Sequence, residues 1–336
     1  MTAMKTIGIV GAGAWGTALA MVARRAGRAV TLQAREAEVA ASINERHENT
    51  LFLPGIALDP AIVATTELAP AAVADAVLLA VPAQHTRAIC TALAPAWKPG
   101  VPVVICAKGI EQGTSALMNE VVTETLPDAP LAVLSGPTFA AEVARDLPAA
   151  VTLACADGDL AEALVTALGA PRFRIYQSPD VVGALVGGAV KNVLAVACGI
   201  VEGRALGDNA RAALITRGLA EIVRLGLAKG ARAETFRGLS GIGDLTLTCN
   251  AMQSRNFSLG AALGRGESLN AILADRASVA EGVFSAAAVS DLARRLAIDM
   301  PISAAMDAVL NHAADIDATI AGLLARRPGA EMPAGG

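Results

Sequence analysis

The chain contains few of the residues that build metal centres, disulfide frameworks or nucleic-acid-binding surfaces. Only three histidines occur among the 336 residues, no two of them at metal-ligand spacing, and the five cysteines form no C-x-x-C pair. We therefore expect no bound metal and reduced thiols, which is typical of a cytoplasmic protein. Aromatic residues make up 3% of the sequence, the net charge is −4, and no basic run is present. This composition argues against binding to nucleic acid.

We also expect no secretion signal, and one long apolar run stands out in the sequence. Lys5 alone precedes the first apolar stretch, and glycines interrupt that stretch, so a strand is expected there. Residues 181–201 carry one charge, Lys191, and are long enough to cross a membrane. A lone ammonium at the bilayer centre costs roughly 3 kcal/mol, however, and small residues recur at every fourth position in register with Lys191. We therefore expect the buried central helix of a soluble protein and no membrane span.

A glycine-rich turn follows the first apolar strand. Residues 7–17 read as a buried strand, a turn and the first turn of a helix. Gly11 allows the tight turn, Gly13 lets a pyrophosphate approach the backbone, and Gly16 lets the helix pack against the strand. The helix N-terminus offers free N–H groups to phosphates, so the segment predicts a dinucleotide site rather than a turn that binds nothing. Trp15 either packs beneath the turn or covers the nicotinamide side of the pocket.

Strands and helices alternate in the first half of the chain. The expected strands are Thr6–Val10, Ala29–Ala34, Ala76–Val81, Val101–Ala107 and Leu131–Leu134, with Ala149–Ala154 and Arg172–Tyr176 as later additions to the sheet. The expected helices are Ala14–Arg25, Ala37–Arg46, Gln84–Leu93 and Ser115–Thr125. This alternation predicts a parallel sheet covered on both faces, in an α/β Rossmann-like domain over residues 1–178. No convincing strand follows, so we expect an all-α domain over residues 179–326 and a loose tail over residues 327–336.

Lys191 is the first candidate for chemistry, because burial lowers the pKa of an ammonium toward neutrality. It is predicted to act as an acid or base, with a structural pairing to a buried carboxylate as the alternative. Asn192 can donate its amide to a substrate oxygen or satisfy the backbone of its own helix. Asp244 lies in a glycine-flanked turn, where it can orient Lys191, bind a substrate hydroxyl or cap the next helix.

A second polar group surrounds Arg255. Its guanidinium matches a phosphate through bidentate hydrogen bonds, and Ser254 and Asn256 add donors, although a solvated surface turn fits the pattern equally well. In the first half, Lys108 follows one expected strand and residues 135–140 follow another. Ligands of open α/β sheets bind beyond the carboxyl ends of the strands. Lys108 is therefore expected beside a polar or anionic substrate.

Eight short motifs stand out along the chain, namely Gly11–Ala20, Asn49–Gly55, Ala107–Gly109, Ser135–Ala140, Gly187–Asn192, Asn209–Gly218, Gly243–Leu245 and Gln253–Asn256. In this order and combination they resemble the bacterial NAD(P)-dependent glycerol-3-phosphate dehydrogenases, and the resemblance runs from Ile7 to about Arg326. It implies a reversible reduction of dihydroxyacetone phosphate to sn-glycerol 3-phosphate, which supplies the glycerol backbone of phospholipids. It also implies a homodimer.

The resemblance assigns roles to individual residues. Lys191 resembles the group that protonates the carbonyl oxygen as hydride arrives. The positions that match the substrate pocket are Lys108, Gly136, Thr138, Lys191, Asp244, Ser254, Arg255 and Asn256. The expected cofactor contacts are Gly11, Gly13, Ala14, Trp15, Gly16, Lys108, Ala140, Arg255, Val279 and Glu281, of which Ala140, Val279 and Glu281 rest on the resemblance alone. The family often has serine where this chain has Ala14 and an aromatic residue where it has Gln33, which weakens the side-chain contact at Ala14.

The expected cofactor is NADP(H), with NAD(H) left open as a second one. An NAD-specific fold usually places an acid after the second strand to hold the ribose 2′-hydroxyl. Here that strand ends in Gln33-Ala34-Arg35-Glu36. Arg35 can bind a 2′-phosphate or stack on adenine, whereas Glu36 repels that phosphate if it points inward.

Other functions stay open at this point. A β-hydroxyacid or 6-phosphogluconate-type dehydrogenase also pairs a Rossmann domain with a helical domain and a central lysine, but the Gly187–Asn192 and Gln253–Asn256 motifs argue against it. A nucleotide-sensing protein without catalysis is disfavoured, because each proposed catalytic position holds a competent residue. A malate- or lactate-type enzyme is disfavoured because no histidine lies in a site-like context.

Overall fold

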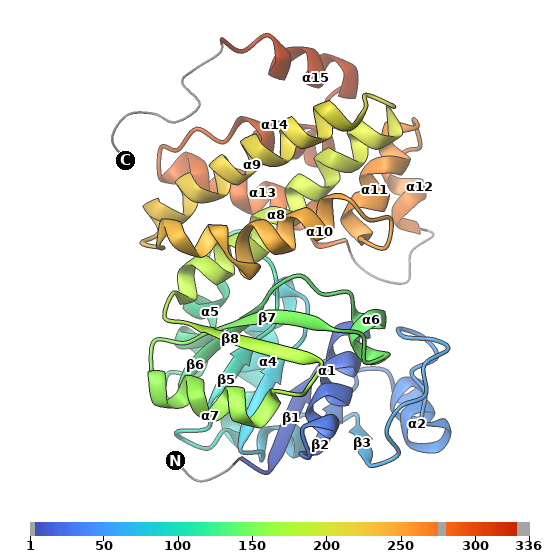
Figure 1. The fold of residues 1–336 in the computed structure, drawn as a ribbon, viewed down its shortest axis with the longest axis vertical. Coiled ribbons are helices and arrows are strands. Elements are labelled where there is room, and N and C mark those ends of the chain that lie inside the picture. The colour runs from blue at the N-terminus through green and yellow to red at the C-terminus, as the bar shows by residue number, and fades with distance from the viewer. Residues whose placement is uncertain (1–3, 275–279, 328–336) are drawn as a thin grey trace.

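The computed structural model describes residues 4–274 and 280–327, which fold into two stacked parts (Figure 1). One part is a sheet with helices packed on it, and the other contains helices alone among the described residues. The predicted α/β domain followed by an all-α domain is thus confirmed. The last strand ends at Ser178 and the next helix begins at Val181. Residues 328–336, most of the predicted tail, lie outside the described residues.

The sheet has eight strands in the order β3-β2-β1-β4-β5-β6-β7-β8. Their bounds are β1 (Thr6–Val10), β2 (Ala29–Gln33), β3 (Ile62–Thr65), β4 (Ala76–Leu79), β5 (Val103–Ile105), β6 (Leu131–Ser135), β7 (Ala149–Ala154) and β8 (Phe173–Ser178). The register pairs Ile7 with Val30 on one side of β1 and with Ala76 on the other. The short strand β3 is absent from the sequence prediction.

The predicted parallel direction holds up to β6 and breaks at β7. Strand β7 pairs antiparallel with β6, whereas β8 is parallel to β7. The connection between β6 and β7 contains only the five-residue α6 (Ala140–Ala144). Such a helix advances ~7 Å, less than half the length of a five-residue strand, so it does not carry the chain back to the start of β6. The chain therefore re-enters the sheet in the opposite direction.

Both faces of the sheet are buried, as the apolar strands predict. Successive residues belong to different core clusters: Ile9 lies in one and Val10 in the other, and Leu78 and Leu79 divide in the same way. The helices of this part are α1 (Ala14–Arg25), α2 (Ala37–Arg46), α3 (Ala69–Ala72), α4 (Thr86–Leu93), α5 (Met118–Thr125), α6 and α7 (Gly158–Leu168), with short turns η1 (Ala83–His85) and η2 (Ala94–Ala96). Helices α1 and α2 have the predicted bounds, and α5 begins after Ser115, whose φ of 59° is not helical.

The second part is built around α8 (Val181–Gly203). Around it lie α9 (Asp208–Ala228), η3 (Ala233–Arg237), η4 (Leu239–Gly243), α10 (Asp244–Cys249), α11 (Arg255–Gly264), α12 (Leu269–Ala274), α13 (Glu281–Arg295), α14 (Pro301–His312) and α15 (Ile316–Leu324). Helix α8 is long and apolar enough to cross a membrane, but 94% of its most apolar window is buried inside the protein. It is thus the buried central helix that the sequence predicts.

The small residues of α8 explain how other backbones approach it. A Cβ atom built on Gly187 would lie 2.4 Å from the carbonyl oxygen of Ser240, and one on Gly199 would lie 2.1 Å from that of Phe257. Both distances are well below van der Waals contact, so only glycine fits at either position. The stripe of small residues therefore brings η4 and α11 directly against α8, on either side of Lys191 along the helix.

Candidate active site

The glycine-rich turn between β1 and α1 has the form that the sequence predicts. Gly11 has φ 104°, a conformation that side chains disfavour. A Cβ on Gly16 would lie 1.9 Å from the carbonyl oxygen of Gly11, which explains why the helix can start so close to the strand. A Cβ on Gly13 would meet nothing within 4 Å. The turn is therefore closed on its inner side and open at Gly13.

This open turn fits the pyrophosphate of a dinucleotide. Gly13 is the N-cap of α1, and Ala14, Trp15 and Gly16 form the first helical turn. The N–H groups of a first helical turn have no partner within the helix and attract anions. Trp15 packs against the core on that side of the sheet, which matches the packing alternative, and its contact with nicotinamide stays a prediction.

Arg35 follows β2 at the same edge of the sheet. Its side chain is 82% exposed and pairs with the Glu36 carboxylate at 2.5 Å. Glu36 is the N-cap of α2. The pair lies beyond the carboxyl end of β2, the edge at which ligands of open α/β sheets bind, and both roles considered for Arg35 stay open.

A buried polar centre joins the two parts of the protein. Lys191 on α8 donates to Asp244 Oδ1 at 2.5 Å, and Lys108, after β5, donates to Asp244 Oδ2 at 2.6 Å. Asp244 is the first residue of α10 and is fully buried, and the Lys191 side chain is 7% exposed. Lys108 also donates to the Gly136 carbonyl oxygen at 3.0 Å. Four predicted site residues from four segments of the chain thus meet, with both lysines on the Asp244 carboxylate and Gly136 on Lys108.

The electrostatics of this centre favour proton transfer by Lys191. Burial lowers the pKa of Lys191 to about 8, with a further lowering by the Lys108 charge, while Asp244 opposes both effects. Burial alone would raise the pKa of Asp244, but the two ammonium groups hold it below the usual value of 3.8. The carboxylate is therefore ionised, and Lys191 can hold or release a proton near neutral pH.

Thr248 completes the surroundings of Lys191 and is absent from the sequence prediction. Its hydroxyl accepts from the Lys191 ammonium at 2.8 Å and donates to the Asp244 carbonyl oxygen at 2.7 Å. Its position four residues after Asp244, on the same helical face, is the signal that could have revealed it. With Asp244 and Thr248 each accepting one N–H, one N–H of the Lys191 ammonium remains for another acceptor.

Asparagine side chains connect the polar centre with the start of α13. Asn192 donates to the Lys108 carbonyl oxygen at 2.8 Å, and Asn256 donates to Asn192 Oδ1 at 3.0 Å. Asn256 Oδ1 in turn accepts from Gly282 N–H at 2.9 Å. Asn192 therefore uses its amide to hold the Lys108 backbone, and Asn256 in turn holds the Asn192 side chain.

The remaining predicted residues that the structure describes have different roles. Ser254 caps α11 by accepting from the Phe257 N–H at 3.2 Å, and Thr138 donates to the Gly136 carbonyl oxygen at 3.3 Å. Ala140 is the first residue of α6. Arg255 begins α11 and interacts electrostatically with Glu281. Val279 lies outside the described residues.

Glu281 links the two parts of the protein. Its Oε1 accepts from the Ala83 N–H, just after β4, at 3.2 Å. Its Oε2 is buried, and a Cβ on Gly109 would lie 3.1 Å from it. Burial raises the pKa of Glu281 above 4.5. Gly11 packs on Val81, which lies two residues before Ala83, and Gly109 directly follows Lys108. Through Ala83, Glu281 and Gly109, contacts therefore run from the glycine turn to the polar centre.

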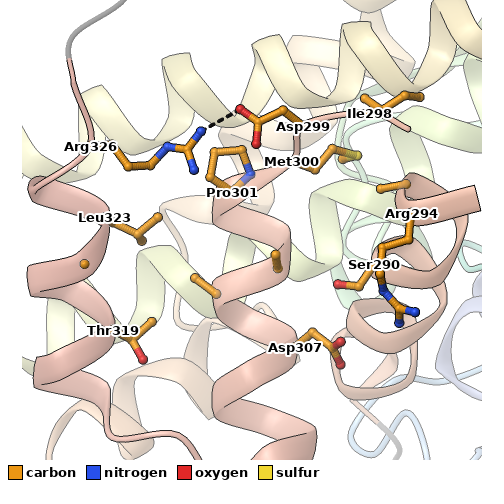
Figure 2. A pocket seen from close by; sticks show the side chains of 14 residues that line it. Ser290, Arg294, Ile298, Asp299, Met300, Pro301, Asp307, Thr319, Leu323 and Arg326 are labelled. Carbon is orange, nitrogen blue, oxygen red and sulfur yellow. Dashed lines mark hydrogen bonds and ion pairs between the residues drawn. The ribbon is translucent and has the colours of Figure 1, made fainter. Parts of the chain in front are cut away.

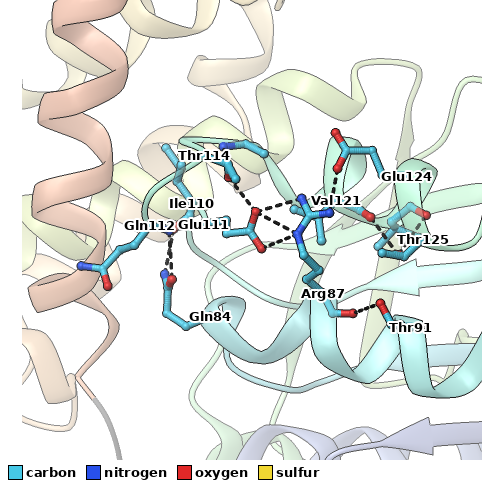
Figure 3. A network of polar contacts seen from close by, with 12 residues as sticks. Gln84, Arg87, Thr91, Ile110, Glu111, Gln112, Thr114, Val121, Glu124 and Thr125 are labelled. Atoms are coloured by element: carbon cyan, nitrogen blue, oxygen red, sulfur yellow. Dashed lines mark hydrogen bonds and ion pairs between the residues drawn. The ribbon is translucent and has the colours of Figure 1, made fainter.

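The loop after Lys108 is held by a network of its own (Figure 3). Arg87 on α4 donates to Glu111 at 2.9 Å and pairs with Glu124 at 2.7 Å, and Thr114 donates to Glu111 at 2.6 Å. Arg295 on α13 donates to the Thr114 carbonyl oxygen at 2.8 Å. The segment that carries Lys108 is therefore tied to both parts of the protein.

A cavity of about 460 Å³ lies elsewhere, between α13, α14 and α15 (Figure 2). The Arg326–Asp299 ion pair, at 2.6 Å, lies along it, together with Ile298, Met300 and Leu323. None of the predicted site residues that the structure describes lines this cavity, so it lies apart from the site described above. Within residues 4–274 and 280–327 no group of three or more His, Cys, Asp or Glu side chains is arranged to hold a metal ion.

Comparison with known proteins agrees with this architecture. Residues 6–161 match the family described as NAD-dependent glycerol-3-phosphate dehydrogenase N-terminus, and residues 180–321 match the corresponding C-terminus. The chain is 63% identical to a glycerol-3-phosphate dehydrogenase [NAD(P)+] of Rhodospirillum rubrum, over 95% of this chain and 92% of that protein. It is 59% identical to the protein of the same name from Caulobacter vibrioides, over 95% and 97%.

A solved structure shows the same fold. The crystal structure of glycerol-3-phosphate dehydrogenase from Coxiella burnetii superposes with a TM-score of 0.92 at 37% identity, covering 96% of this chain and 99% of that one. This likeness agrees with the matches to both halves of the sequence. The chain belongs to the NAD-dependent glycerol-3-phosphate dehydrogenase family.

Proposed function

We propose that this protein catalyses the reversible, NAD(P)H-dependent reduction of dihydroxyacetone phosphate to sn-glycerol 3-phosphate. The observation that carries the proposal is the buried Lys191–Asp244–Lys108 centre, linked by continuous contacts to the glycine turn. A ketone reduced to a secondary alcohol needs a hydride on carbon and a proton on oxygen. This site has a place for a cofactor that supplies the first and an ammonium that supplies the second.

The cofactor would be held by the open turn at Gly13 and the first turn of α1, with Ala140, Arg255 and Glu281 as further contacts. The fit is supported by the inner side of the turn, where Gly11 and Gly16 leave no room for a Cβ, and by its empty outer side. When bound, the nicotinamide supplies hydride in reduction and accepts it in oxidation. The protein's part is to fix the ring and to exclude water from the polar centre.

Lys191 is the proposed proton donor in reduction and acceptor in oxidation. Its remaining N–H would be directed at the substrate oxygen, while Asp244 and Thr248 hold the other two. As the carbonyl oxygen gains negative charge, the ammonium stabilises it and then transfers the proton. Asp244 stays ionised throughout and keeps Lys191 oriented.

The substrate phosphate needs fixed positive charge, and Arg255 is the proposed ligand, with Asn256 beside it. Lys108 shares Asp244 with Lys191, so the two lysines and one carboxylate carry a net positive charge. That charge favours an anionic three-carbon substrate in the same space. Gly136, Thr138 and Ser254 would then shape the pocket rather than supply charge. The Gly136 carbonyl oxygen accepts from Lys108 and from the Thr138 hydroxyl, and the Ser254 hydroxyl caps α11.

NADP(H) is the proposed preferred cofactor, with Arg35 as the ligand of the 2′-phosphate and NAD(H) as a second cofactor. Binding would require Arg35 to exchange its Glu36 partner for the phosphate. We also propose a cytoplasmic homodimer that supplies sn-glycerol 3-phosphate for phospholipids. Light scattering of the purified protein tests the dimer, and cell fractionation tests the compartment.

The experiment that tests the function follows NADPH and NADH oxidation with a panel of substrates. Turnover is expected with dihydroxyacetone phosphate and not with β-keto acids or 3-keto-6-phosphogluconate-type compounds. A protein that binds NADPH but turns over none of them would be a nucleotide-binding protein without catalysis. Turnover of a β-keto acid alone would favour the β-hydroxyacid dehydrogenase alternative.

A further inference from the structure

Asn49 begins a motif, Asn49–Gly55, that the proposed function leaves without a role. It lies in the connection between α2 and β3, and its side chain is completely buried. A fully buried asparagine is uncommon and is tolerated where its amide is fully hydrogen-bonded. The contacts of Asn49 therefore indicate what the motif does.

The Asn49 side chain reaches the glycine turn, 37 residues earlier in the chain. Its amide nitrogen donates to the Ala12 carbonyl oxygen at 2.8 Å and to Thr17 Oγ1 at 2.8 Å. Its amide oxygen accepts from the Phe52 N–H at 3.0 Å. The two N–H groups of the Asn49 amide thus hold the glycine turn at Ala12 and at Thr17 in the first turns of α1. The amide oxygen instead holds the backbone of the Asn49–Gly55 motif at Phe52.

The bond to Ala12 sets the direction of the next N–H group. In a planar trans peptide the carbonyl and the following N–H point in opposite directions. With the Ala12 carbonyl directed inward to Asn49, the Gly13 N–H is directed away from Asn49, and a Cβ built on Gly13 meets no atom on its own side within 4 Å. In the part of the chain that the structure describes, no protein acceptor receives the Gly13 N–H. That donor is therefore available to an anion.

We infer that Asn49 is a positioning residue for the cofactor: it holds the Ala12–Gly13 peptide in the orientation that presents the Gly13 N–H to a pyrophosphate. The inference rests on the proposed function only in taking a dinucleotide as the ligand. Without the amide, only the longer bond from the Thr17 hydroxyl, at 3.4 Å, still holds the Ala12 carbonyl oxygen. The peptide is then held less firmly, and binding of the cofactor must supply the free energy of ordering it. We expect this loss of preorganisation to weaken dinucleotide binding by about tenfold or more.

The competing explanation is that Asn49 only stabilises the fold by closing its own motif through Phe52. Two variants separate these roles. Asn49→Ala removes all three side-chain hydrogen bonds and leaves the backbone bond from the Leu53 N–H to the residue 49 carbonyl oxygen, whereas Asn49→Asp keeps the acceptor for the Phe52 N–H and replaces the amide donors. Asn44→Ala is the matched control, because Asn44 on α2 bonds both the N–H and the carbonyl of Ala64 on β3 and does not touch the turn.

The test measures the dissociation constants of NADPH and NADH by calorimetry, the thermal midpoint, and the steady-state constants. Both Asn49 variants are expected to raise the dissociation constant and the cofactor KM about tenfold or more, with kcat at saturating cofactor and the substrate KM within about twofold of wild type. Asn44→Ala is expected to lower the thermal midpoint without changing cofactor affinity.

Three outcomes overturn the inference. One is cofactor affinity in Asn49→Ala equal to that of wild type. Another is wild-type affinity in Asn49→Asp, which would show that the acceptor alone matters. The third is failure of both Asn49 variants to fold where Asn44→Ala folds, which would make the role structural. Wild-type protein that binds neither dinucleotide would instead refute the proposed function, so the two failures are distinguishable.

Discussion

The glycine turn and the polar centre of this protein are built in opposite ways. The turn is made from residues 7–17, and its close contacts run between neighbours such as Gly11 and Gly16. The polar centre takes Lys108 from the sheet domain and Lys191 and Asp244 from two helices of the other part. The turn takes its shape from neighbouring residues and is supported from within the same domain by Asn49, whereas the centre exists only when the two parts pack together.

The two regions also differ in how they meet solvent. The turn is open at Gly13, where a Cβ would meet nothing within 4 Å. The polar centre is buried, and burial is the largest cause of the lowered pKa of Lys191. Binding of the dinucleotide and transfer of the proton are therefore expected to fail separately, and the following variants test that separation.

The largest effect is expected from Lys191→Ala. Removing a general acid typically lowers turnover by about 100-fold or more, and we expect that loss with unchanged NADPH affinity. Lys229→Ala is the matched control, because Lys229 pairs with Glu120 at 2.6 Å away from the site. Stopped-flow or steady-state assays with dihydroxyacetone phosphate measure turnover. A near-normal rate in Lys191→Ala would mean that the proton comes from another group.

Two glycine substitutions should break one region at a time. Gly187→Ala places a Cβ 2.4 Å from the Ser240 carbonyl oxygen and should displace the segment leading to Asp244, whereas Gly16→Ala places one 1.9 Å from the Gly11 carbonyl oxygen. Overpacking of this kind costs about 1–3 kcal/mol. We expect about a tenfold loss of kcat in Gly187→Ala and about a tenfold rise in the cofactor dissociation constant in Gly16→Ala.

Gly158→Ala is the control for both glycine variants, because a Cβ there meets nothing within 4 Å. Kinetic constants, direct cofactor binding and the thermal midpoint are measured for all three. Equal loss of kcat and cofactor affinity in Gly187→Ala and Gly16→Ala would contradict the separation of the two regions.

The pH dependence of turnover should follow the titration of Lys191 in the polar centre. With a Lys191 pKa of about 8, the protonated form needed for reduction is lost as pH rises through 8, and the neutral form needed for oxidation is gained there. Asp244 raises this pKa, so Asp244→Asn should move both profiles to lower pH and lower turnover several-fold. Asp317→Asn, which removes an exposed carboxylate on α15, is the control. Profiles of kcat/KM that coincide in wild type and Asp244→Asn would exclude Lys191 as the titrating group.

The smallest effect is expected from Arg35→Ala. An exposed guanidinium contributes about 1 kcal/mol or less in water, so NADPH affinity should fall by about fivefold or less, with NADH affinity unchanged. Fluorescence titration with each cofactor measures both. If the preference for NADPH stays as it was, Arg35 is not the ligand of the 2′-phosphate.

Several elements could be predicted because their signals are local. The bounds of β1, α1 and α2 follow from apolar periodicity and the glycine turn, and the apolar run at residues 181–201 was correctly interpreted as a buried helix from its small residues and single lysine. Strand β3 was missed because it has only four residues, and one of them, Val63, is exposed. The direction of β7 was missed because strand composition does not encode which way a neighbour runs.

The sequence alone determined the turn, the alternation of strands and helices, and the presence of one lysine in an apolar helix, because these depend on neighbouring residues and on period. Only the tertiary structure decided that Lys108 and Lys191 share one carboxylate, that Thr248 accepts from Lys191, and that Asn49 holds the Ala12 carbonyl oxygen. The physical reason is that a hydrogen bond requires atoms within about 3 Å. Which residues come that close is set by the packing of helices and strands far apart in the chain.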